Sequence, residues 1–346
     1  MIVVITEHFY ILPASISGKG AYISRPMTRV LSLLSSFACI CSAVFLCACD
    51  ESEAGKPKVG GTGQDISLPP LQKAIYLRAK GDRLPGTVFH NRATLTMAGA
   101  NLTMTRADVI IPGSATMIMR DLWEVEQVSP TERTFKIDEM SRTFEAVMEG
   151  KPKQERTEST LTGIPFEVTR TDSAAPWVLS PSEIKLTHLQ EIDLRMLGTL
   201  WDEGAEDLYP AEPLKLGQVW KADPKAFGII VSPRLIVEEG EVTCRLDEIT
   251  VLRGQRCGAI SVDIDITGTF QMAGSAGMKV QIALTGTIMR SLYKNYDMRT
   301  ELKGSMQLEM HFPEQDTTIS IDGVAEFLQL AEMTPPENGE EAEEAE

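Results

Sequence analysis

The side chains best suited to chemistry in this sequence are two carboxylates on one predicted strand. Asp263 and Asp265 lie two residues apart, so a strand directs both to the same face, where paired carboxylates can hold a cation or flank a sugar. No third ligand group lies near them in the sequence, and a solvated polar face also accounts for the pair. His90, His188 and His311 are far apart and form no metal-ligand motif. We therefore expect neither a metal site nor a cofactor.

A serine among small residues is the nearest approach to a catalytic motif. The segment AGSAG at 273–277, with Ser275 at its centre, resembles the nucleophile elbow of the α/β-hydrolases with alanine in the first glycine position. That elbow needs a strand before the serine and a helix after it, whereas 273–277 joins two segments of strand periodicity. A flexible hairpin loop is the better interpretation. We expect a non-enzymatic protein and keep an envelope hydrolase that uses Ser275 only as a third hypothesis.

Two cysteines in the body of the chain, Cys244 and Cys257, are candidates for a disulfide. If residues 253–254 form the two-residue turn of a hairpin, Cys244 faces Asp263 and Cys257 faces Thr250. The two sulfur atoms then lie roughly 20 Å apart along the strands at about 3.3 Å per residue. A disulfide needs α carbons within about 7 Å, so we expect two free thiols.

The charge of the chain restricts its partners. Acidic residues outnumber basic ones by 49 to 33, which gives a formal net charge of −16. No local cluster of lysine and arginine reverses this sign, so nucleic acid is a poor partner. Residues 335–346 carry a run of glutamates without a basic residue, which predicts an acidic disordered tail.

The first 48 residues have the pattern of a secretion leader. Residues 30–48 are uncharged and follow Arg25 and Arg29, as the apolar region of a signal peptide follows its basic region. Met1 and Met27 are alternative candidates for the translation start, and Met27 gives the more compact leader. A run of this length also fits a membrane-spanning helix, which is the alternative interpretation.

The end of this run resembles the lipobox of bacterial lipoproteins. In the segment LCAC at 46–49, a leucine lies three residues before Cys49 and a small residue lies directly before it. Cys47 departs from the pattern, because that position usually holds alanine or serine. The resemblance implies cleavage after Ala48, thioether lipidation of Cys49 and fatty acylation, such as palmitoylation, of the new amino terminus. Stable anchoring follows from several acyl chains, although which membrane holds the anchor stays open.

Beyond Cys49 the sequence divides into a tether and a body. Residues 49–68 are polar and glycine-rich and predict a flexible tether, and residues 69–334 predict a β-rich globular body. Period-two alternation is clearest at 260–267, 280–284 and 306–312 and weaker at 122–128, 134–139 and 159–168. Leu-Thr-Gly recurs at 161–163 and 284–286, which suggests either two related β-units, at about 86–179 and 240–330, or chance. We expect an α+β fold of mostly antiparallel sheet, curved or half-barrel in shape.

One prominent amphipathic helix is predicted between the two halves. Residues 180–203 change to helical spacing, with Ser180 and Glu183 as a capping box and Pro181 at the first helical position. A crossover at 209–220 follows. The apolar stripe of this helix either seals the sheet as core or covers a cavity. The residues that would line such a cavity are Leu189, Met196, Leu200 and Trp201.

The order of these elements is similar to that of the half-barrel lipoprotein carriers of bacteria, and also of β-rich lipoproteins of planctomycete-type bacteria. No specific motif carries either resemblance, so the function that each implies is an analogy of fold. Our leading hypothesis is a membrane-tethered envelope lipoprotein with a structural or interaction role and unknown protein partners. The alternative is a module that binds or transfers a lipid or other hydrophobic ligand held between sheet and helix.

Overall fold

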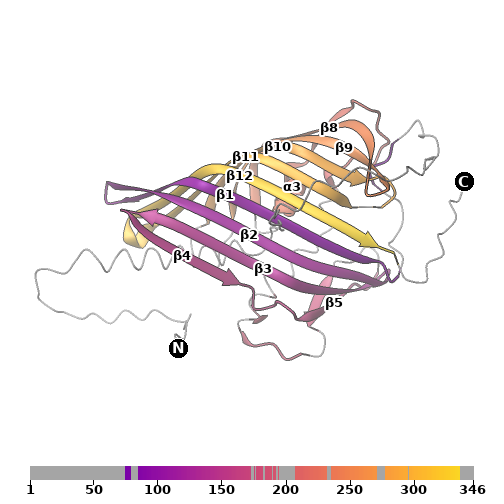
Figure 1. Cartoon of the computed structure of the whole chain (residues 1–346), viewed down its shortest axis with the longest axis horizontal. Coiled ribbons are helices and arrows are strands. Elements are labelled where there is room, and N and C mark those ends of the chain that lie inside the picture. Colours follow the sequence, from indigo (N-terminus) through magenta and orange to yellow (C-terminus); the bar gives the residue numbers. More distant parts are fainter. Residues whose placement is uncertain are drawn as a thin grey trace, which may run out of the picture.

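The computed structural model describes residues 75–78, 85–172, 177–181, 184–188, 207–231, 235–270, 277–294 and 296–335, together with residues 175, 190, 191 and 194. Within them the chain forms one antiparallel, curved sheet of twelve strands (Figure 1). The strands are β1 Val88–Arg106, β2 Val109–Ser129, β3 Glu132–Met148, β4 Lys151–Glu158, β5 Pro165–Thr169, β6 Val178–Pro181, β7 Val219–Ala222, β8 Leu235–Leu252, β9 Gln255–Phe270, β10 Met278–Ser291, β11 Asp297–Phe312 and β12 Thr317–Thr334.

Two successive meanders make up this sheet, and they meet at β1 and β12. The strand order is β6-β5-β3-β2-β1-β12-β11-β10-β9-β8-β7, with β4 also paired to β3. The strand that opens the described sheet therefore lies beside the strand that closes it, from Val88 opposite Thr334 to Arg106 opposite Thr317. The hydrogen bonding is continuous across this junction, so the two halves form one sheet.

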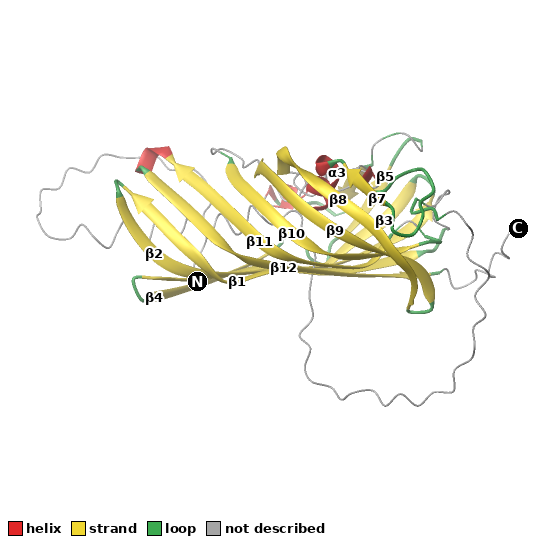
Figure 2. Cartoon of the chain, turned by 90° about the horizontal axis from the view of Figure 1, so that it is seen from above, coloured by secondary structure: helices red, strands yellow, loops and turns green. Residues whose placement is uncertain are grey.

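The two faces of the sheet differ in polarity. Along β11, buried Leu302, Met306 and Leu308 alternate with exposed Glu301 and Gln307, as the period-two pattern of the sequence predicts. The sheet curves toward the side that carries the short helix α3, Pro224–Val231 (Figure 2). We call this apolar side the inner face, because Phe227 of α3 packs within the same hydrophobic cluster as Leu302.

Two glycines on the inner face allow neighbouring strands to approach closely. A Cβ atom at Gly286 would lie 1.9 Å from the carbonyl oxygen of Glu301, and one at Gly304 would lie 2.0 Å from that of Ala283. Both distances are far below van der Waals contact, so only glycine fits the backbone there. Glycine at such positions lets a sheet bend, and it leaves the inner face without side chains at two points between β10 and β11.

Most of the strands expected from the sequence are confirmed. Residues 260–267, 280–284 and 306–312 lie in β9, β10 and β11, and 122–128 and 134–139 lie in β2 and β3. The strand expected at 159–168 is wrong in its first half, which is a turn, because only Pro165–Thr169 pairs with β3. Leu-Thr-Gly at 161–163 lies in that turn, whereas 284–286 lies inside β10, so the two matches do not occupy equivalent positions.

The prominent helix expected at 180–203 is not shown. Ser180 and Pro181 belong to β6 and lie opposite Glu167 and Phe166 of β5, because the edge of β5 provides hydrogen-bond partners for an extended backbone. Residues 195–203 lie outside the residues that the structure describes.

A capping box exists further along the same segment. The backbone N–H of Thr187 donates to Oε1 of Gln190 over 2.9 Å, and the N–H of Gln190 donates to Oγ1 of Thr187 over 3.4 Å. This is the reciprocal arrangement of a capping box, and the residues after it are helical where they are described, at 188, 190, 191 and 194. The helical turn therefore begins seven residues later than Ser180.

The cysteine region largely follows the predicted hairpin. Arg253 and Gly254 have positive φ angles of 51° and 76°, as a two-residue hairpin turn requires, and Cys257 lies opposite Thr250. A bulge between Leu246 and Glu248 then shifts the register by one residue, so Cys244 lies opposite Val262 instead of Asp263. Both cysteines are buried and free.

Candidate functional site

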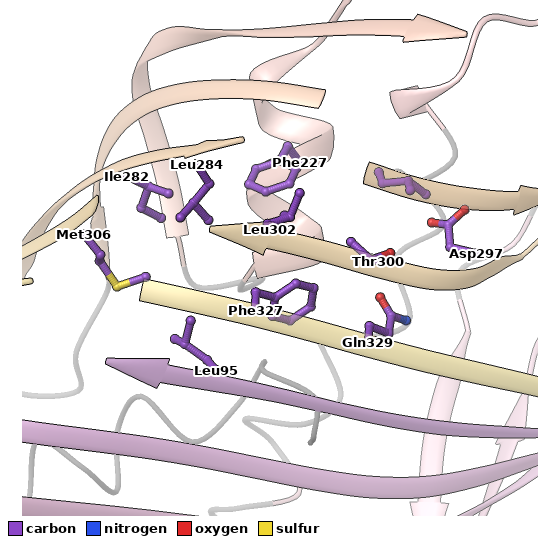
Figure 3. A pocket seen from close by; sticks show the side chains of 11 residues that line it. Leu95, Phe227, Ile282, Leu284, Asp297, Thr300, Leu302, Met306, Phe327 and Gln329 are labelled. Carbon is purple, nitrogen blue, oxygen red and sulfur yellow. The ribbon is translucent and has the colours of Figure 1, made fainter. Parts of the chain in front are cut away.

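An apolar cleft lies between α3 and the inner face of the sheet (Figure 3). The space inside it that the protein leaves free is about 20 Å³, roughly the room that one water molecule needs. Phe227 extends from α3 toward Leu302 and Leu284 on the sheet, and Phe327 and Leu95 continue the apolar lining across β12 and β1.

One end of the cleft is polar. Thr300, Gln329 and Asp297 lie together at this end, and Ile282, Leu284 and Met306 lie at the other (Figure 3). Of the eleven lining residues these three are polar and eight are apolar. The cleft is therefore amphipathic, with hydrogen-bonding groups confined to one side.

The polar end belongs to a band of polar side chains that crosses the inner face, which we call the polar belt: Asn91, Asp121, Arg142, Arg290, Asp297, Thr300 and Gln329. Register explains its position. Asp121 lies opposite Ala93, Ala93 opposite Gln329, and Gln329 opposite Thr300, so four neighbouring strands place these residues in one row. Two hydrophobic clusters lie on either side of the belt, one around Leu302 and Phe327 and one around Phe89 and Phe135.

An ion pair forms one side of the polar belt. Nη2 of Arg142 lies 2.9 Å from Oδ2 of Asp121, and the same guanidinium donates to the carbonyl oxygens of Arg120 and Ser141. The two side chains are only 2% and 1% exposed. Burial raises the pKa of Asp121 from 3.8 to about 6, against the opposing effect of the Arg142 charge.

A second arginine and carboxylate form the other side of the belt. Nη1 of Arg290 lies 2.9 Å from Oδ1 of Asp297, and the hydroxyl of Tyr209 donates to the same oxygen over 2.8 Å. The Arg290 guanidinium also donates to the carbonyl oxygen of Leu77 and stacks 4.0 Å above the Tyr209 ring. Burial raises the pKa of Tyr209 well above its ordinary value of 10, so the phenol stays protonated and acts as a donor.

Between these two pairs lie uncharged groups. Nε2 of Gln329 donates to Oδ1 of Asn91 over 2.8 Å. The Nδ2 atom of Asn91 is buried and has no hydrogen-bond partner in the described part of the chain. A buried amide without an acceptor is unfavourable, so Asn91 keeps a donor that the described residues do not satisfy.

The residues singled out in the sequence contribute little to this site. Cys49, Ser275 and the four expected lining residues Leu189, Met196, Leu200 and Trp201 lie outside the described residues. Asp263 and Asp265 are exposed on the face opposite the cleft, facing Thr285 and Ala283 of β10. They form part of a solvated polar face.

The described histidines lie beside polar side chains, and the two described cysteines are buried. His90 lies 3.3 Å from Glu124, His188 lies 3.9 Å from Glu191, and His311 lies 3.0 Å from the hydroxyl of Thr318. No group of three metal-ligating side chains occurs among the described residues. Burial raises the pKa of the Cys244 thiol to about 12, so this thiol is not activated as a nucleophile.

The elements that build the cleft gave weak signals in the sequence. Asp223-Pro224 marks the start of α3, since Oδ1 of Asp223 accepts from the N–H of Lys225 over 2.9 Å and proline suits the first turn. The helix is only eight residues long, which is too short for a distinct helical period. Asp121 and Arg142 interrupt otherwise apolar inward positions, and that interruption was the available signal for the polar belt.

No helix in the described part of the chain has the length and apolar character of a membrane span.

No protein-family model matches the chain, and no curated protein matches it. Among solved structures it is similar to lipovitellin, described for its lipid-protein interactions, with a TM-score of 0.36 and 10% identity over 75% of this chain and 27% of that one. The chain thus spans about a quarter of lipovitellin. It is also similar to an outer membrane channel from Pseudomonas putida F1, with a TM-score of 0.23 and 7% identity over 77% and 100% of the two chains. A third similar structure is a putative outer membrane lipoprotein-sorting protein domain from Vibrio parahaemolyticus, with a TM-score of 0.14 and 10% identity over 74% and 88%.

Proposed function

We propose that this protein is a non-enzymatic binding module that holds a hydrophobic ligand in the cleft between α3 and the inner face of its sheet. The observation that carries the proposal is the lining of the cleft, in which eight of eleven residues are apolar. Its free volume is about 20 Å³, so the cleft must widen to admit a ligand. Removing apolar ligand surface from water provides the driving force. Because the inner face of the sheet is apolar and the outer face is polar, we expect such a ligand to bind on the inner face.

The binding experiment uses N-phenyl-1-naphthylamine, an uncharged apolar dye whose fluorescence rises on transfer out of water. We expect the purified chain to bind the dye saturably. Leu284→Trp places a larger side chain in the cleft and should weaken binding at least tenfold. Ala283→Trp is the matched control, because its neighbouring position on β10 directs the new ring to the outer face, where Ala283 lies opposite Asp265 and Ser305. Equal binding by both variants would show that the dye does not bind in the cleft.

The second candidate is a structural or interaction role in the envelope. It is favoured by the tip of the β1–β2 hairpin, where Val109 and Ile110 are 60% and 67% exposed directly after the turn at 107–108. Adjacent exposed apolar side chains are typical of contact surfaces. A chain that binds no dye and releases no lipid on organic extraction would favour this role over ligand binding.

We further propose that the body is tethered to a membrane by a lipid on Cys49. Expression in a bacterial host with a lipoprotein-processing pathway should give an amino-terminal peptide that begins at Cys49 and carries the mass of diacylglyceryl and acyl groups. Cys49→Ser should release the body from membranes on washing with salt. An unmodified Cys49 peptide, or cleavage at another residue, would contradict the proposal.

A further inference from the structure

Resting on the proposed ligand-binding function, we propose that the ligand is amphipathic, with an apolar chain and an uncharged, hydrogen-bond-accepting head such as an ester or amide carbonyl. The polar belt receives the head at Asn91, Thr300 and Gln329, and the apolar end of the cleft receives the chain.

The charges of the belt argue against a charged head. Asp121 is neutralised by Arg142, and Asp297 is neutralised by Arg290. Both guanidinium groups also donate to backbone carbonyl oxygens. A carboxylate or phosphate head would have to displace one of these buried partners, and a buried charge without its partner is strongly unfavourable.

The uncharged groups between the two ion pairs provide the recognition. Thr300 and Gln329 line the cleft directly, and Gln329 uses its Nε2 to bond Asn91. The partnerless Nδ2 of Asn91 is a donor, so the belt lacks an acceptor. A carbonyl oxygen from a ligand supplies that acceptor, either to Asn91 itself or after the paired amides reorient. A plain hydrocarbon has no oxygen atom and cannot supply this acceptor.

The geometry of the cleft matches this division. Thr300 and Gln329 are register partners on β11 and β12, and the next inward pair along the same strands is Leu302 and Phe327. Successive inward pairs on adjacent strands therefore change from polar to apolar within two residues, about 7 Å along a strand. An ester carbonyl and the start of its alkyl chain span a comparable length.

The test compares three competitors of equal chain length for displacement of N-phenyl-1-naphthylamine at pH 8: dodecane, methyl dodecanoate and dodecanoate. We expect methyl dodecanoate to bind about five- to tenfold more tightly than the other two, as one satisfied hydrogen bond allows. Thr300→Val and Gln329→Met should each reduce the preference for ester over hydrocarbon. Thr285→Val, on the outer face of β10, should preserve it.

The outcomes separate the two proposals. If dodecane binds as tightly as the ester, or if dodecanoate binds most tightly, the uncharged head is wrong while ligand binding in the cleft stands. If neither the dye nor any competitor binds, the proposed function fails and this inference fails with it. The comparison of competitors on the unmodified chain needs no variant, so it holds even if a substitution in the belt prevents folding.

Discussion

Asp121 and Arg142 form an ion pair that is withdrawn from solvent on the inner face of the sheet, with side chains 1% and 2% exposed. They come from neighbouring strands, β2 and β3, at positions two residues out of direct register, since Asp121 lies opposite Met140 and Arg142 opposite Met119. Each side chain therefore crosses diagonally to reach the other. The pair lies in the row of residues that leads to the polar end of the cleft.

Replacing Arg142 by Met should strongly destabilise the protein at pH 7. The Asp121 carboxylate would remain buried without its counter-charge, which costs about 3–5 kcal/mol in such sites. Urea unfolding followed by circular dichroism measures this loss. Lys136→Met is the control, because Lys136 pairs with Asp138 at the surface and exposed pairs contribute about 1 kcal/mol or less. Equal losses in the two variants would contradict a special role for the buried pair.

The pH dependence of stability should carry the signature of Asp121. Its pKa is raised from 3.8 to about 6 in the folded protein, so between these values the folded state binds more protons than the unfolded state. The contribution of this group to the free energy of unfolding therefore falls by on the order of 3 kcal/mol as the pH rises from about 4 to 6. Above pH 6 the contribution is level. Asp121→Asn removes the group, so the difference in unfolding free energy between variant and unmodified chain should change across this window. A constant difference would show that the pKa of Asp121 is not raised.

Replacing Gly286 by Ala should disturb the sheet beneath the cleft. The added Cβ would lie 1.9 Å from the carbonyl oxygen of Glu301, so β10 and β11 must separate locally. Overpacking of this kind costs about 1–3 kcal/mol, measurable as a lower urea midpoint. Thr285→Ala alters the neighbouring exposed position and should change stability by less than about 0.5 kcal/mol. No change in the Gly286 variant would mean that the strands are not so close.

Phe227 should be the residue that fixes α3 to the sheet. It is 2% exposed and contributes to both the core cluster and the cleft, so Phe227→Ala should cost about 3–5 kcal/mol. Lys225→Ala, on the exposed side of the same helix, is the matched control. If the core substitution costs no more than the control, α3 does not pack against the inner face as the structure shows.

The sequence by itself determined the strands and their faces. Alternation of Ile260, Val262 and Ile264 with polar residues requires one apolar and one solvated face, and this holds along β9 because a strand has only two sides. Arg253-Gly254 likewise determined the β8–β9 turn, because a two-residue hairpin turn requires positive φ angles and glycine adopts them readily. By contrast, Ser180-Pro181 carried a helix-start signal that was overridden, because the edge of β5 offered backbone partners that local sequence does not reveal.

Only the tertiary structure decided where the candidate site lies. The pairing of β1 with β12 joins residues more than two hundred positions apart and brings Asn91 to Gln329 and Leu95 to Phe327. No local pattern specifies such a partner, because any apolar strand face fits any other. The polar belt and the cleft depend on that register, on the bend at Gly286 and Gly304, and on the docking of a helix too short to show its own period. The sequence determined which side chains point inward, and the long-range pairing of strands determined which of them meet.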